Sequence, residues 1–188
     1  MGKNSNAAVS SAVCISKNHK KCQADLNTAI GISDLLDWKN ADQILTRFQQ
    51  YADANVTEML TLCANRAKFY QCLGTQYSSC NAYTYVNMYN SLDFLCNAGF
   101  EEAVNQYSCL QTIALTNANK ACIDTFQSNI LGHPERLCDS ATTAGLCLND
   151  VYSNGCQHDK KGAGWFGCQN FIGAFDETCF PKNRCYVH

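Results

Sequence analysis

The segment "CANRAKFYQCLGTQYSSC" (residues 63–80) carries cysteines at both ends and at position 72, and it contains no proline. It continues the strongest helical pattern in the chain, which starts at Asn55 and repeats apolar residues at positions 56, 59, 60, 63, 67 and 70. We therefore expect one long helix in this part of the chain, with Asn55 as its N-terminal cap.

Neighbouring cysteines on such a helix are too far apart to pair with each other. Eight or nine residues of helix span about 12–13.5 Å, whereas the Cα atoms of a disulfide lie within about 7 Å. Cys63, Cys72 and Cys80 must each reach a neighbouring element, unless the helix breaks. Nine residues also rotate by about 900°, a net half turn, so that Cys63 and Cys72 face opposite sides. The sequence thus predicts a central helix that is cross-linked to partners on both sides.

The cysteine content indicates an oxidising compartment. The chain has 188 residues, a formal net charge of −2 and 14 cysteines. It contains no CxxC pair, and the closest cysteines are Cys179 and Cys185, which disfavours a zinc or iron–sulfur site. Disulfides remain as the expected state of the cysteines, and the sequence leaves their pairing open. The predicted disulfide cysteines are Cys14, Cys22, Cys63, Cys72, Cys80, Cys96, Cys109, Cys122, Cys138, Cys147, Cys156, Cys168, Cys179 and Cys185.

Proline is scarce, which favours helices, since only Pro134 and Pro181 occur. The predicted helices cover residues 10–30, 40–51, 55–73, 83–96, 100–116, 119–131 and a stretch after Pro134 with a break near Gly145. The glycine-rich segment "NGCQHDKKGAGWFGC" (154–168) is interpreted as a loop that leads into a short helix over 168–178. We therefore expect an all-α fold, a disulfide-stapled helical bundle of about six to seven helices with a loop-rich C-terminal tail.

The remaining features predict a secreted protein of one domain. Residues 1–13 are expected to be a disordered or artificially added N-terminus, and residues 14–188 a single cysteine-rich helical domain. The polar start "MGKNSNAAVSS" (1–11) is neither a signal peptide nor a myristoylation signal, so we interpret the chain as the mature part of a secreted protein. No apolar run reaches the roughly 20 residues of a membrane span, and no basic field indicates nucleic acid. Asn55-Val56-Thr57 predicts N-glycosylation at Asn55.

The order and spacing of the cysteines are similar to those of a family of secreted nematode domains, catalogued as domain of unknown function nineteen. The resemblance covers residues 14–179. It implies a secreted helical domain in which about twelve cysteines pair, and it implies no catalytic residue. Cys168 and Cys185 exceed the family pattern and are candidates for an additional bridge in the tail. The matching positions are Cys14, Cys22, Cys63, "FYQC" to Cys72, Cys80, Cys96, Phe100, Cys109-Leu110, "KAC" to Cys122, Cys138, Cys147, Cys156 and Cys179.

One histidine–aspartate pair is a candidate for hydrolysis. His158 and Asp159 follow Cys156 in "CQHDK", and secreted phospholipases A2 use a similar His-Asp word to activate water. The doubled cysteine of those enzymes is absent, and the glycine-rich loop follows the pair instead of preceding it. An exposed polar loop is therefore the preferred interpretation. Because no GxSxG or phosphate-loop motif occurs either, we expect no enzyme, no cofactor and no metal.

Trp165 and Phe166 lie within "GAGWFG" (162–167) and allow two interpretations. On a glycine loop they could form an exposed binding tip, because aromatic residues are common at interaction hot spots. Alternatively, they anchor the tail to the core, and this interpretation is preferred.

The sequence is most consistent with an extracellular binding or recognition module that acts on a protein partner without catalysis. The first alternative is a small carrier of lipid or another apolar ligand, because cross-linked helices rich in apolar residues can enclose a cavity. A secreted hydrolase using His158 and Asp159 ranks third.

Overall fold

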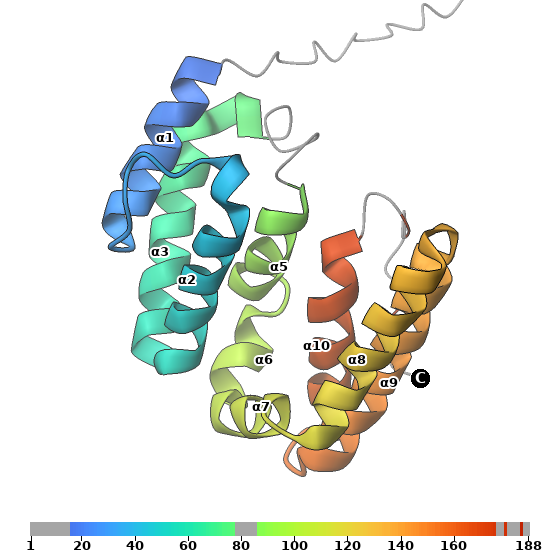
Figure 1. Ribbon diagram of the computed structural model, residues 1–188. Coiled ribbons are helices and arrows are strands. Elements are labelled where there is room, and N and C mark those ends of the chain that lie inside the picture. Colours follow the sequence, from blue (N-terminus) through green and yellow to red (C-terminus); the bar gives the residue numbers. More distant parts are fainter. Residues whose placement is uncertain (1–15, 78–85, 176–178, 180–184, 186–188) are drawn as a thin grey trace, which may run out of the picture.

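The computed structural model describes residues 16–77, 86–175, 179 and 185, and it shows an all-α fold (Figure 1). No strand occurs among these residues. Three of the predicted sequence features fall outside them: residues 1–13, Cys14 and Cys80. The described α-helices are α1 (Ser16–Ala29), α2 (Ala41–Ala54), α3 (Val56–Leu73), α5 (Val86–Cys96), α6 (Phe100–Asn105), α7 (Tyr107–Ala114), α8 (Asn117–Gly132), α9 (Leu137–Gly155) and α10 (Lys160–Ile172).

The predicted fold class is confirmed, with a finer division of the helices than expected. The predicted helix over 100–116 is divided at Gln106, whose backbone leaves the helical region between α6 and α7. The Gln106 side chain donates to Glu102 Oε2 (2.6 Å) and to the Asp159 carbonyl (3.2 Å), which ties this division to the start of α10. A short 3₁₀ turn, Gly173–Phe175, follows α10.

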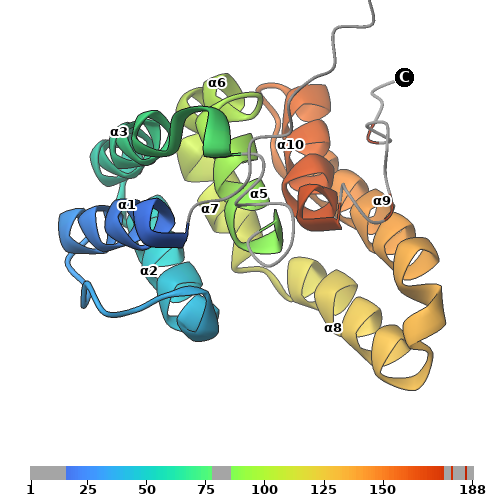
Figure 2. The same ribbon diagram turned by 90° about the horizontal axis from the view of Figure 1, so that it is seen from above.

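The helices form three groups that lie side by side in two perpendicular views (Figures 1 and 2). Helices α1–α3 make up one flank, α8–α10 make up the other, and α5–α7 lie between them. We call the described residues of 16–96 the first half and those of 100–185 the second half. This division matters for the site, because the cavity described below lies between the two halves.

Helix α3 is cross-linked on two sides, as its cysteine spacing predicts. Cys63 pairs with Cys96 at the end of α5, and Cys72 pairs with Cys22 in α1. Their Cα atoms lie 5.2 Å and 5.8 Å apart, respectively. Asn55 caps this helix, since its side chain accepts a hydrogen bond from the Glu58 amide at 2.9 Å. Both predictions for α3 are therefore confirmed.

Helix α9 plays the corresponding part in the second half. Cys138 and Cys147 in α9 and Cys156 directly after it lie nine residues apart along the chain, so they pair not with one another but with three separate segments. Among the described residues no cysteine is free, and none of the disulfides joins the first half to the second. The disulfides of the second half are Cys109–Cys156, Cys122–Cys147, Cys138–Cys179 and Cys168–Cys185.

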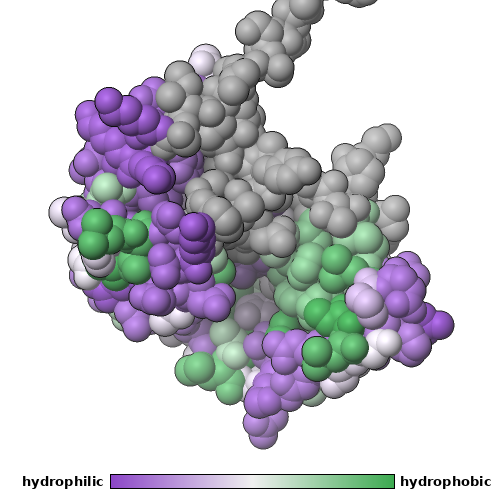
Figure 3. All heavy atoms as spheres, turned by 45° about the horizontal axis from the view of Figure 1, so that its top comes forward, coloured by the Kyte–Doolittle hydropathy of each residue, from purple (hydrophilic) through white to green (hydrophobic). Residues whose placement is uncertain are grey.

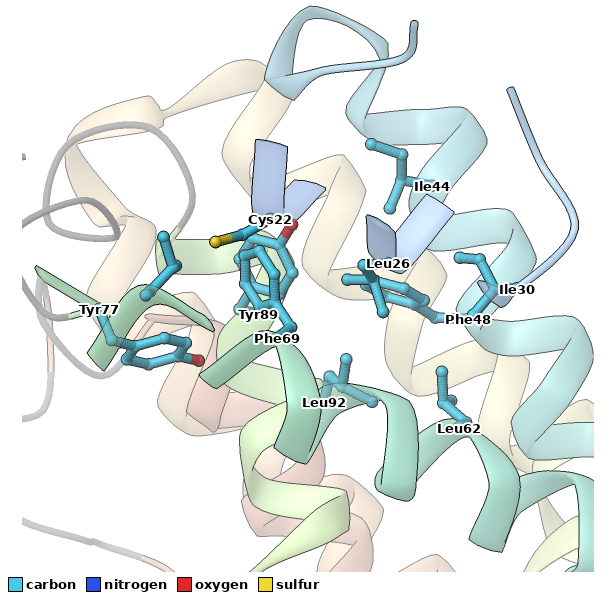
Figure 4. Packing of buried hydrophobic residues seen from close by; sticks show 11 residues of the cluster. Cys22, Leu26, Ile30, Ile44, Phe48, Leu62, Phe69, Tyr77, Tyr89 and Leu92 are labelled. Carbon is cyan, nitrogen blue, oxygen red and sulfur yellow. The ribbon is translucent and has the colours of Figure 1, made fainter. Parts of the chain in front are cut away.

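The core of the first half combines apolar packing, which Figure 4 shows, with a row of hydrogen-bonded polar side chains that are also buried. Phe69 of α3 stacks on Tyr89 of α5, with 5.0 Å between the ring centroids. The Tyr89 hydroxyl donates to Gln23, which donates to Asn27 Oδ1 at 2.7 Å. Asn27 in turn donates to the Ser33 and Leu36 carbonyls and so fixes the loop after α1. These fully buried polar groups are thereby satisfied, as burial requires.

Helices α9 and α10 approach each other closely, which corrects the loop predicted over the glycine-rich segment. A Cβ added at Gly164 would lie 2.9 Å from the Asn149 carbonyl oxygen, and one at Gly167 would lie 2.5 Å from the Tyr152 ring. The glycines are therefore compatible with a helix in which a neighbouring helix occupies the space of their side chains. Gly145 has the same role on α9, because an added Cβ would meet Ile172 at 2.6 Å. Accordingly, α9 runs through Gly145 without the predicted break.

Gly164→Ala is expected to destabilise the protein by about 1–3 kcal/mol, because the new methyl group would force α9 and α10 apart against a backbone carbonyl. The measurement is the free energy of unfolding in urea. Gly132→Ala is the matched control, since no atom lies within 4 Å of its added Cβ at the end of α8. Equal stability of the two variants would contradict the close packing described above.

Candidate functional site

A cavity of about 200 Å³ lies between the two halves, and we call it the central pocket. Helices α2, α3 and α5 contribute one side of it, and α6, α7, α9 and α10 contribute the other. Most of its surface is apolar, as is usual for small-molecule sites. The lining residues are Leu45, Phe48, Gln49, Ala52, Asp53, Met59, Leu62, Leu92, Leu95, Ala103, Tyr107, Leu110, Gln111, Ala114, Tyr152, Phe166 and Asn170.

The apolar wall of the central pocket consists of residues from both cores. Leu62 and Leu92 belong to the apolar cluster of the first half, and Met59, Leu110 and Phe166 belong to the cluster that extends through the second half. All five are buried. The pocket is therefore a gap at the boundary of two packed clusters, and its wall is held in place by both.

One pair of hydrogen bonds positions α7 against α2 beside the pocket. Tyr107 and Gln111 are four residues apart on α7 and thus lie on one face of it. The Tyr107 hydroxyl donates to the Ala52 carbonyl at 2.8 Å, and Gln111 Nε2 donates to the same oxygen at 3.5 Å. Ala52 lies in the last turn of α2, where carbonyls lack partners within the helix. The two halves are thus joined by hydrogen bonds to a carbonyl group in the last turn of α2.

Tyr152 and Asn170 are two of the polar residues of the lining, together with Gln49, Asp53, Tyr107 and Gln111. Both line the central pocket and also a second cavity of about 260 Å³, which lies between α8, α9 and α10 and which we call the side cavity. Among the described residues neither side chain has a hydrogen-bond partner. Their hydroxyl and amide groups are therefore available to a ligand. The Tyr152 ring rests on Gly167, so the close approach of α9 and α10 sets its position.

Asp53 gives the central pocket a negative charge. It lies in the last turn of α2, and both of its carboxylate oxygens accept hydrogen bonds of 2.8 Å from Gln49 Nε2. No lysine, arginine or histidine lines the central pocket in the part of the chain that the structure describes. Burial first and the Asp53 charge second raise the pKa of Tyr107. The same two causes raise the pKa of Tyr152 to about 12.

His158 and Asp159 lie away from both cavities. Both residues are exposed at the start of α10, and the Asp159 carboxylate accepts a hydrogen bond from the Gly162 amide at 2.9 Å. Asp159 is thus the N-cap of α10, a structural role that its position in the sequence explains. Neither residue lines the central pocket or the side cavity. This geometry gives no support to the predicted hydrolytic pair.

Trp165 and Phe166 do not form an exposed tip, because "GAGWFG" lies within α10. Phe166 is only 8% exposed and lies against Phe94 with 5.5 Å between ring centroids, while the half-buried Trp165 meets the same ring edge-on at 5.3 Å. The binding-tip interpretation is therefore wrong, and the pair packs against α5 as the alternative predicted. Phe166 nevertheless contributes to the site by lining the central pocket.

Sequence reasoning did not identify Asp53, Tyr152 and Asn170 as site residues. They lie 99 and 18 residues apart in sequence, as their numbers show, and no local motif connects them. One signal in the sequence could have pointed to Tyr152. Glycines on a helix, as in "GAGWFG", indicate that another helix packs closely there, and the ring of Tyr152 on α9 occupies the space beside Gly167. That signal could have been recognised only after the segment had been predicted as helical.

The described residues contain neither a cluster of metal ligands nor a membrane-spanning helix. No group of three or more histidine, cysteine or acidic side chains is arranged to hold a metal ion. No described helix is both long and apolar enough to cross a membrane.

Comparison with protein-family models, with curated proteins and with solved structures finds no match for this chain. The similarity of its cysteine spacing to the nematode family therefore stays a prediction.

Tyr152 should make the stability of the protein decrease at alkaline pH. Its pKa is about 12 in the folded state and 10.0 in the unfolded state, so the unfolded chain loses the proton first. The stabilising effect is complete below pH 10 and is lost as the pH rises toward 12. Between pH 8 and 11 we expect the wild type to lose about 1.4 kcal/mol more than Tyr152→Phe. Rapid urea unfolding at each pH measures this difference, and coinciding slopes would contradict the burial of the hydroxyl.

Proposed function

We propose that this protein is an extracellular binding protein without catalytic activity, and that it holds a small, mainly apolar ligand in the central pocket. The disulfides support the compartment, because such bonds persist in oxidising surroundings and are rare in the cytosol. The carrier alternative from the sequence is favoured here because a pocket with a mainly apolar lining lies between the two halves.

The unpartnered side chains of Tyr152 and Asn170 are the observation that carries this proposal. A purely structural gap between two clusters would be closed by apolar residues or would have its polar groups satisfied. Here Tyr152 and Asn170 line cavities whose other residues are mostly apolar, and neither side chain has a hydrogen bond to a described residue. A site that orients a small molecule usually has an apolar wall with a few polar groups on it.

Recognition of a protein partner is the second candidate, and exposed leucines are the observation in its favour. Leu35, Leu115 and Leu131 are 85%, 88% and 85% exposed. They lie on separate segments: the loop after α1, the end of α7 and the end of α8. Figure 3 shows the hydrophobic residues of one face in separate groups divided by hydrophilic surface. A stable protein interface has a contiguous apolar centre, so this observation supports the second candidate less than the pocket supports the first.

The neutral fluorescent probe N-phenyl-1-naphthylamine should bind at one site, and Ala114→Trp should weaken its binding about tenfold or more by filling the pocket. Ala114 is suitable because it lines the central pocket from the exposed end of α7, so that the larger side chain leaves the core intact. The measurement is a fluorescence titration, with thermal unfolding to verify the fold.

The matched control is Thr112→Trp, which adds the same side chain to an exposed position of α7 outside the lining. It should bind the probe as the wild type does. Loss of binding in both variants, or in neither, would contradict the central pocket as the binding site.

Asn55 should carry an N-glycan when the protein is produced through a eukaryotic secretory pathway. Asn55 and Thr57 are exposed, and the helix cap uses the Asn55 oxygen, which leaves its amide nitrogen for the glycan. Glycosidase treatment should reduce the apparent mass of the wild type and leave that of Asn55→Gln unchanged. Secreted protein without a glycan on Asn55 would refute the predicted site.

A further inference from the structure

We propose that the central pocket selects an apolar amine, a molecule with a hydrocarbon body and one protonated nitrogen, over a carboxylate of the same size. This inference rests on the proposed function and specifies the chemical class of its ligand.

The charge of the lining is the first argument. Among the described residues, Asp53 is the only acidic side chain of the lining, and no basic side chain lines the pocket to neutralise its charge. Its oxygens already accept from Gln49, but each retains a lone pair for a second donor. A ligand ammonium group could therefore bind Asp53 without displacing Gln49.

The orientation of α2 is the second argument, and it is independent of Asp53. The pocket residues Ala52 and Asp53 lie in the last turn of this 14-residue helix. The C-terminal end of a helix carries a partial negative charge, which favours cations in its last turn. The backbone and the side chain thus act in the same direction at this edge of the pocket.

Two polar residues of the lining, Tyr152 and Asn170, provide the third argument. The Tyr152 hydroxyl and the Asn170 amide oxygen can each accept a hydrogen bond, and an ammonium group has three donors. The carboxylate of a fatty acid in the pocket would lie close to Asp53 and would have no cationic partner among the described lining residues. Both the desolvation and the like charge oppose that arrangement. The hydrocarbon body of either ligand would meet the same apolar wall, so the head group decides between them.

The test uses three ligands with one eight-carbon chain: octylamine, octan-1-ol and octanoate. Each displaces N-phenyl-1-naphthylamine from the folded, disulfide-bonded protein at pH 7. In the wild type, octylamine should bind more tightly than octan-1-ol, and octanoate most weakly. Asp53→Asn should weaken octylamine about fivefold, the value of one partly exposed charge pair. The same variant should strengthen octanoate and leave octan-1-ol unchanged.

Asp42→Asn is the matched control, because it removes the same charge from an exposed position in the first turn of α2, outside the lining. It should leave all three affinities as in the wild type. The inference is overturned if octanoate binds as tightly as octylamine, or if the two variants have equal effects.

The uncharged octan-1-ol separates this inference from the proposed function. If octan-1-ol binds and Ala114→Trp prevents its binding, the pocket is a ligand site even where the preference for an amine fails. If none of the three ligands binds, both the preference and the proposed ligand site are refuted.

Discussion

The length of a helical turn is the constraint on which this structure depends. Cysteines eight or nine residues apart on a straight helix cannot meet, so each sulfur must find its partner on a different segment. In α3, Cys63 is therefore bonded to α5 and Cys72 to α1. The cysteines in α9 and directly after it are bonded to three further segments. Two central helices therefore organise the molecule, one in each half, and the central pocket lies between these halves.

The helices and their cross-linking could be predicted from the sequence because both follow from local spacing. Asn55 and the apolar pattern after it were sufficient to place α3 and its cap. The loop predicted for the glycine-rich segment was wrong for a physical reason. Its glycines do not form a local turn but make room for Asn149 and Tyr152 on a neighbouring helix. The pocket is beyond sequence reasoning for the same reason: Asp53, Tyr152 and Asn170 meet only after the halves have packed.

The close contact of α9 and α10 connects stability to the proposed function. Gly167 leaves room for the ring of Tyr152, a residue that lines both cavities. Asn170 lies less than one turn after Gly167 on α10 and lines the same two cavities. The positions of Tyr152 and Asn170 are thus set by the packing of helices and not by loops. A site built on helices keeps its geometry better than one built on mobile segments.

The described disulfides all lie within one half or the other, and this has a mechanical consequence. Disulfides cross-link the segments within each half. The boundary between the halves is held by apolar contacts and by the hydrogen bonds of Tyr107 and Gln111 to Ala52. Separation of the two halves would therefore disrupt apolar contacts and these hydrogen bonds, while every described sulfur–sulfur bond would stay intact.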